Sequence, residues 1–163
     1  MRIIIAVATL ALLILPAQAQ DWGTDFNMGT FAAGGGSAAN GYLNLECPDE
    51  SSGFDTAGQP FVTLTPMDGV VLNKKSVPEE GIAFWVDDDQ SYLLPMSLEP
   101  SGNSLDYDYS VESAQSVRDM VEAMRKGDTV TAYAGGLDGI RLVMITLDGS
   151  AAALEFVEGC IAE

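Results

Sequence analysis

The sequence predicts a mainly β fold with two helices (α+β), arranged as a small β-sandwich-like domain. Two observations support this class. Short segments in which apolar and polar residues alternate recur along the chain, and glycine, aspartate and proline turns separate them. Two other segments, residues 114–124 and 153–161, carry apolar residues at the spacing of a helix face. One helix would therefore lie between strands, and one would close the chain.

The first 19 residues have the pattern of a secretory signal peptide. Arg2 provides a positive start, residues 3–15 are apolar, and the Ala-Gln-Ala sequence at residues 17–19 is a small-x-small cleavage site. The apolar run is shorter than the roughly 20 residues that a membrane-spanning helix needs. We expect residues 1–19 to be removed, which would leave a soluble periplasmic or secreted chain with no membrane insertion.

The exported part is predicted to be one domain that follows a flexible start. Residues 20–41 contain the run Ala-Ala-Gly-Gly-Gly-Ser, which is typical of a flexible segment or turn. Residues 42–163 are then expected to form a single domain, because a chain of roughly 120 residues can bury a sizeable core.

The strands of this domain are recognised by alternating apolar and polar residues or by short β-branched runs. They are predicted at residues 42–47, 61–65, 70–72, 82–86, 92–96, 105–109, 129–134 and 140–147. Three aspartates and a glutamine at residues 87–90 indicate a hairpin turn. In the last strand, Val143 and Ile145 alternate with Leu142 and Met144, which predicts a central strand covered on both faces.

Both helices have recognisable ends. Ser113 is a suitable N-cap for the first helix, and Gly127 is its stop signal. Arg125 and Lys126 in its last turn complement the negative end of the helix dipole. Ser150 is expected to begin the closing helix after an Asp-Gly turn.

Several of these segments resemble the invasion-associated locus B family of bacterial envelope proteins. They are residues 61–70, 81–87, 124–127 and 145–154, so the resemblance covers residues 61–154. A strand followed by proline, glycine and valine, and a glycine-led strand that ends in aspartate, are similar to segments of that family. The resemblance implies a secreted or periplasmic β-sandwich-like domain. We carry over the fold and the compartment, but not the role in host-cell invasion that some members have.

The chain has two cysteines, Cys47 and Cys160, whereas members of that family usually have more. Two cysteines in an exported chain most often form a disulfide. Cys47 shares one strand face with Leu43 and Leu45, and Cys160 lies on the apolar stripe of the closing helix. No Cys-x-x-Cys spacing is present to lower a thiol pKa, so we expect a structural role. We therefore predict that Cys47 and Cys160 form a disulfide that staples the domain.

The charge of the chain is strongly negative. It has 24 acidic and seven basic residues, a net charge of −17, and no histidine; loss of Arg2 with the leader would make the charge −18. Such a surface repels nucleic acid and anionic lipid headgroups, so neither is an expected partner. It favours a protein or cell-surface partner, possibly basic, although solubility in a salty exterior explains the charge equally well.

No cofactor and no catalytic residue is predicted. Without histidine, a Ser-His-Asp or Cys-His site and any histidine-ligated zinc or copper site are excluded. Paired carboxylates for glycoside hydrolysis are possible among so many acids, but the sequence does not select a pair. Asp87 and Asp89 are a calcium candidate at a turn, although the glycine and glutamate that an EF-hand loop needs are missing.

The favoured function is a non-catalytic, envelope-associated binding module. Trp85, Tyr107, Tyr109 and Tyr133 are the aromatic candidates for contact with a partner, and half-buried packing is the alternative role for each. Two other functions stay open: a small carboxylate-based hydrolase of envelope polysaccharide, and an acidic inhibitor or immunity protein for a basic secreted enzyme.

Overall fold

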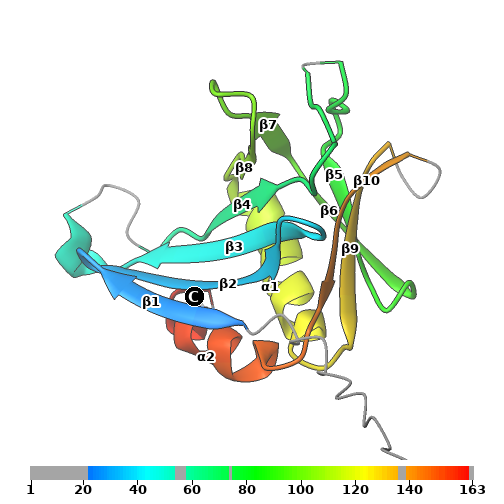
Figure 1. The fold of residues 1–163 in the computed structure, drawn as a ribbon. Helices are drawn as coiled ribbons and strands as arrows, with labels where there is room; N and C mark the ends of the chain where they lie inside the picture. Colours follow the sequence, from blue (N-terminus) through cyan, green and yellow to red (C-terminus); the bar gives the residue numbers. More distant parts are fainter. Residues whose placement is uncertain (1–21, 54–57, 74, 136–138, 162–163) are drawn as a thin grey trace, which may run out of the picture.

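The computed structural model describes residues 22–53, 58–73, 75–135 and 139–161. The leader predicted at residues 1–19 lies outside these residues. The described part contains two antiparallel sheets, two α-helices and one short 3₁₀ helix, η1 (Glu50–Ser52). One helix lies between strands and one closes the chain, so the predicted α+β class is confirmed (Figure 1).

The first sheet has six strands in the order β1-β2-β3-β4-β8-β7. Their bounds are β1 (Gly23–Asn27), β2 (Thr30–Ser37), β3 (Gly41–Pro48), β4 (Phe61–Thr65), β7 (Met96–Leu98) and β8 (Leu105–Tyr107). Alternation places Leu43, Leu45 and Cys47 of β3 on the buried face, as expected from a period of two.

The second sheet has four strands in the order β10-β9-β5-β6. Their bounds are β5 (Ile82–Val86), β6 (Gln90–Leu94), β9 (Thr129–Ala134) and β10 (Ile140–Thr146). Two hydrogen bonds join β10 to the first sheet and its connections: Met144 N donates to Asn40 O at 2.9 Å, and Met67 N donates to Leu142 O at 2.8 Å. They satisfy backbone groups at the edge of β10 that would otherwise lack a ladder partner.

One helix packs against each sheet. Helix α1 (Val111–Met124) contacts β5 and β6, and helix α2 (Ser150–Ile161) contacts β1, β2 and β3. Buried side chains from both sheets and both helices form one cluster, which includes Leu45, Leu64, Phe84, Met120, Ile145 and Leu154. The described elements therefore share a single hydrophobic core.

The N-cap of α1 is Ser110, three residues before the predicted Ser113. Ser110 Oγ accepts from Ser113 N, and Ser113 Oγ accepts from Ser110 N, both at 3.1 Å. The two serines form a reciprocal capping box, so Ser113 is part of the cap but does not begin the helix.

The segment expected to be flexible, residues 20–41, instead contributes β1 and β2 to the first sheet. Trp22 is buried, and its indole Nε1 donates to Thr146 O at 3.0 Å. A Cβ added at Gly35 would lie 2.8 Å from the Trp22 ring. This glycine therefore provides space for packing and does not mark a mobile linker.

Two strand predictions also differ from the structure. Residues 70–72 form no strand; Leu72 is buried and Val71 is exposed in the connection that follows β4. Strand β10 is an edge strand, and Met144 is 46% exposed, so it is not covered on both faces. A β-bulge between Arg141 and Val143 explains why Leu142 and Val143 are both buried.

Candidate functional site

The second sheet has one face toward the core and one face toward solvent. Ile82, Phe84 and Val86 point to the core and pack with α1. The register of the strands places ten residues on the opposite side, which we call the open face. They are Ala83, Trp85, Ser91, Leu93, Thr129, Thr131, Tyr133, Arg141, Met144 and Thr146. In Figure 1, α1 and the first sheet lie on the other side of this sheet.

Large apolar and aromatic side chains occupy the open face. Leu93 is 50% exposed and Met144 is 46% exposed. Trp85 and Tyr133 are half-buried and lie diagonally on neighbouring strands, because Ala83 pairs with Tyr133 and Trp85 pairs with Thr131. Aromatic and flexible apolar groups held on a rigid sheet are the composition that protein interfaces favour.

The open face contains no carboxylate. None of the 24 acidic residues of the chain falls in β5, β6, β9 or β10, and Arg141 is the one charged side chain among the ten residues of this face. The whole chain has a net charge of −17, whereas this face carries no negative side chain. Negatively charged groups of a partner would therefore not be repelled by side chains of this face.

Acidic residues instead gather at one end of the same sheet. Asp87, Asp88 and Asp89 form the turn from β5 to β6, Asp128 precedes β9, and Asp148 follows β10. The pairs Val86–Gln90, Val86–Val130 and Thr129–Thr146 bring these ends of the strands together. The open face thus has an apolar centre with an acidic rim along one end.

Trp85 has a buried indole N–H without an acceptor among the described residues. An unpaired buried donor costs about 1–3 kcal/mol, which phenylalanine at this position would avoid. Local conflicts of this kind are concentrated at functional sites in natural proteins. Trp85 therefore combines a costly buried donor with a half-buried ring on the open face.

The structure separates the four aromatic candidates into two groups. Trp85 and Tyr133 lie together on the open face, whereas Tyr107 ends β8 of the first sheet and Tyr109 lies between β8 and α1. Tyr107 is 5% exposed, and its hydroxyl is 2.5 Å from Ser113 Oγ of the capping box, so it packs in the core. Tyr109 is 38% exposed and stacks edge-on against Tyr107.

Sequence reasoning missed Leu93 and Met144. The signal that identifies them is the absence of acidic residues from four strands of a very acidic chain, combined with their outward positions in the alternation. The register of the strands is needed to show that these residues share one surface.

Asp87 of the calcium candidate accepts two backbone hydrogen bonds. Asp87 Oδ1 accepts from Thr129 N at 2.8 Å and from Asp128 N at 2.9 Å. The hydrogen bond from Thr129 N, followed by that from Asp128 N, lowers the pKa of Asp87 below its usual value of 3.8. The carboxylate thus holds the turn to the start of β9. Among the described residues, no group of three or more metal-ligating side chains includes Asp87 or Asp89.

Cys47 is buried on the inner face of the first sheet, where α2 packs. It pairs across the strands with Phe31, whose ring lies 5.1 Å from the ring of Phe156 in α2. Residue 160 follows Phe156 by about one helical turn. The side chain of Cys160 lies outside the described part of the structure, so the disulfide stays a prediction.

Neither α-helix of the described residues is long and apolar enough to cross a membrane. No curated protein and no solved structure matches the chain. A family model described as YfjT matches residues 20–154.

This match overturns the resemblance to the invasion-associated locus B family. The motifs behind that resemblance are strand ends, turns and a helix end, which many β-rich folds share. They also began at residue 61, whereas the YfjT match includes the segment that forms β1 to β3. Because the YfjT match spans most of the chain, the chain belongs to the YfjT family.

Proposed function

We propose that this chain is an exported, non-catalytic binding module whose open face binds a protein partner with an apolar centre and a basic rim. The observation that carries the proposal is a sheet face that no described helix or strand covers and that has Trp85, Leu93, Tyr133 and Met144 but no carboxylate. Typical protein interfaces have an apolar, aromatic centre from which charged residues are depleted, and a polar rim.

Charge complementarity defines the partner further. The acidic rim at Asp87, Asp88, Asp89, Asp128 and Asp148 would attract basic groups that surround the apolar patch of the partner. An association of this kind becomes slower as salt concentration rises, because rim charges act mainly on the association rate. A basic secreted enzyme inhibited by this chain would be one such partner.

Export and the disulfide belong to the same proposal. The signal-peptide pattern at residues 1–19 directs the chain out of the cytoplasm, to the periplasm or beyond. In that oxidising compartment, a Cys47–Cys160 disulfide would link β3 to α2. The contacts of α2 with β2 and β3 support this pairing.

The hydrolase alternative finds less support. A glycoside hydrolase needs a carboxyl group whose pKa is raised so that it can act as an acid. The described carboxyl groups with a shifted pKa are Asp87, Glu99 and Glu122, and hydrogen bonds lower the pKa of each.

The test adds one negative charge at two exposed aliphatic positions. Leu93→Glu places it on the open face, and Val71→Glu places it in the connection after β4, where Val71 is 83% exposed. Envelope extract is passed over the immobilised wild-type chain and both variants, at low and high salt. We expect a protein that wild type and Val71→Glu retain at low salt and Leu93→Glu loses.

Two results would overturn the proposal. If both variants retain the protein equally, the open face is not the contact surface. If purified wild type sediments as a dimer and Leu93→Glu sediments as a monomer, the face is occupied by a second copy of the chain.

A further inference from the structure

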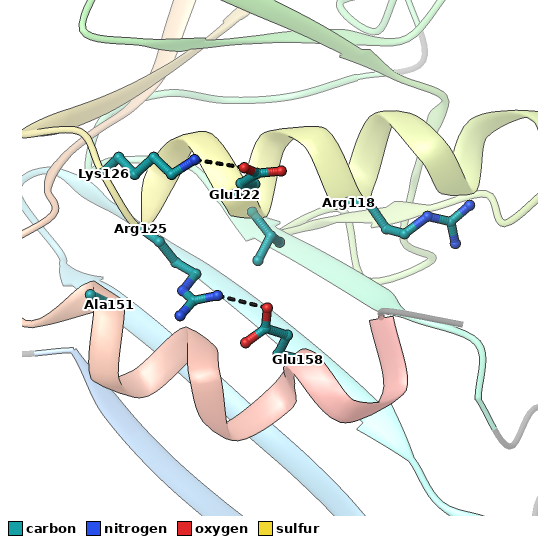
Figure 2. A pocket seen from close by; sticks show the side chains of 7 residues that line it. Arg118, Glu122, Arg125, Lys126, Ala151 and Glu158 are labelled. Atoms are coloured by element: carbon teal, nitrogen blue, oxygen red, sulfur yellow. Dashed lines mark hydrogen bonds and ion pairs between the residues drawn. The ribbon is translucent and has the colours of Figure 1, made fainter.

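We propose that a groove between α1 and α2 binds the carboxylate group of a small organic acid or of a peptide C-terminus. The groove has a volume of about 520 Å³, which falls within the usual range of small-molecule sites. Its charged lining consists of Arg118, Glu122, Arg125, Lys126 and Glu158 (Figure 2). This site is separate from the open face, and the inference does not depend on the proposed function.

The groove concentrates positive charge in an acidic chain. Three of the seven basic residues line it, and two acidic residues accompany them, so its charged side chains sum to +1. The chain as a whole carries −17. A small anion is therefore attracted here, whereas an extended polyanion would also meet the acidic surface around it.

Two of the three cations already have partners. Arg125 Nη1 lies 2.7 Å from Glu158 Oε1 and connects the two helices, and Lys126 Nζ lies 2.6 Å from Glu122 Oε1. Figure 2 shows both pairs, with Arg118 apart from them toward the start of α1. Arg118 Nε donates to Gln115 Oε1 at 3.2 Å, and no carboxylate of the described residues forms an ion pair with Arg118. Its guanidinium is the group available to a ligand.

The chemistry of the groove selects a monocarboxylate. A guanidinium presents planar pairs of N–H donors that match a carboxylate. A phosphate monoester carries nearly two negative charges at neutral pH and would lie near Glu122 and Glu158. The side chain of Val121 and the methyl group of Ala151 also line the groove, so the acid should have a small apolar part.

The two helices are fixed relative to each other before a ligand arrives. Ser150 Oγ, at the start of α2, donates to Met124 O at the end of α1 at 3.0 Å, and Ser150 is buried. Together with the Arg125–Glu158 pair, this hydrogen bond keeps the groove open at one width. A preformed site loses less entropy when it binds a small ligand.

The experiment titrates the chain without its predicted leader (residues 20–163) with N-acetyl-leucine and with its neutral amide, and follows backbone amide shifts by NMR. A peptide with a free C-terminal leucine and inorganic phosphate are titrated in parallel. We expect N-acetyl-leucine, but not its amide, to shift amides of residues 118–126 and 151–158. If the peptide binds more tightly than N-acetyl-leucine, the natural source is a peptide terminus; if it binds more weakly, the source is a free acid.

Two variants locate the site. Arg118→Gln should weaken binding of N-acetyl-leucine about tenfold, because it removes one charge-assisted hydrogen-bond donor. Ala151→Phe adds a large side chain at the Arg125 end of the groove without changing the charge, and it should weaken binding by occupying the space of the apolar part of the acid. Lys75→Gln removes a charge from an exposed residue elsewhere and should leave binding unchanged. Equal binding of the amide, tighter binding of phosphate, or unchanged binding by Arg118→Gln would each overturn the inference.

Discussion

The solvent-facing sides of the two sheets differ in charge. On the first sheet, Asp25, Glu46 and Asp106 point outward. Glu46 Oε1 accepts from Asn44 Nδ2 at 2.6 Å, and Asp106 Oδ1 accepts from Thr63 Oγ1 at 3.2 Å. On the second sheet, the open face has no acidic residue. Both faces belong to one chain in one solvent, so solubility alone does not explain the difference.

The difference separates two roles for a sheet surface. The outer face of the first sheet carries acidic side chains beside the exposed Tyr42 and Phe61, and α2 covers its inner face over β1 to β3. The second sheet keeps its acids at one end, and Leu93 and Met144 are exposed on the open face away from them. An exposed apolar face that carries no acid, with acids at one end of it, is typical of a contact surface.

The largest expected effect concerns the predicted disulfide, which would link the first sheet to α2 and has no counterpart in the second sheet. If Cys47 and Cys160 form a disulfide, it closes a loop of roughly 110 residues and stabilises the fold by about 4–5 kcal/mol in the chain-entropy model. Reduction should then lower the melting temperature by roughly 10–20 °C. Hydrogen exchange should increase first in β2, β3 and α2. Thermal unfolding with and without reductant measures the effect.

The control for this experiment is the double variant Cys47→Ala with Cys160→Ala. Its melting temperature should already be low and should not respond to reductant. A wild-type melting temperature that reductant leaves unchanged would contradict the disulfide.

A smaller effect distinguishes the two tryptophans. Trp22 donates a hydrogen bond to Thr146 O, whereas the N–H of Trp85 has no described acceptor. Trp22→Phe should lower the free energy of unfolding by about 1–3 kcal/mol, because it leaves the Thr146 carbonyl unpaired and opens space over Gly35. Trp85→Phe removes an unpaired donor. Its free energy of unfolding should therefore fall by at least about 1 kcal/mol less than that of Trp22→Phe. Urea unfolding of the two variants gives both values, and an equal loss would mean that Trp85 serves folding as much as Trp22 does.

The fold class was predictable because strand alternation and helix periodicity are local properties. Residues 61–65, 82–86 and 129–134 were predicted as strands and are β4, β5 and β9. β2 was missed because its glycines carry no alternating pattern. Its pairing depends on β1 and β3 on either side and on the Trp22 ring above Gly35.

The candidate site was predictable only in part. Trp85 and Tyr133 were identified as aromatic contacts, but so was Tyr107, which is buried in the core with its hydroxyl against Ser113 of the following helix. Leu93 and Met144 are about 50 residues apart in sequence, and they share a face only through the register of four strands. Local patterns do not contain that register.

The smallest expected effect is at the acidic end of the second sheet. Asp87 and Asp88 both adopt positive φ values, 53° and 57°, but only Asp87 accepts hydrogen bonds from Thr129 N and Asp128 N. Asp87→Asn should therefore destabilise the chain at neutral pH by less than about 1 kcal/mol, since the group is exposed to solvent. Asp88→Asn is the matched control, because asparagine tolerates the same backbone conformation.

The pH dependence of this effect has a definite sign. The pKa of Asp87 is lower in the folded chain than its ordinary 3.8, so the ionised group stabilises the folded state above about pH 4. This contribution is lost as the pH falls through the lowered folded pKa, and the two variants should then become equally stable. Urea unfolding of wild type and both variants between about pH 3 and pH 7 measures it. A difference between Asp87→Asn and Asp88→Asn that does not change with pH would show that the shape of the amide, and not the charge of the carboxylate, matters at this turn.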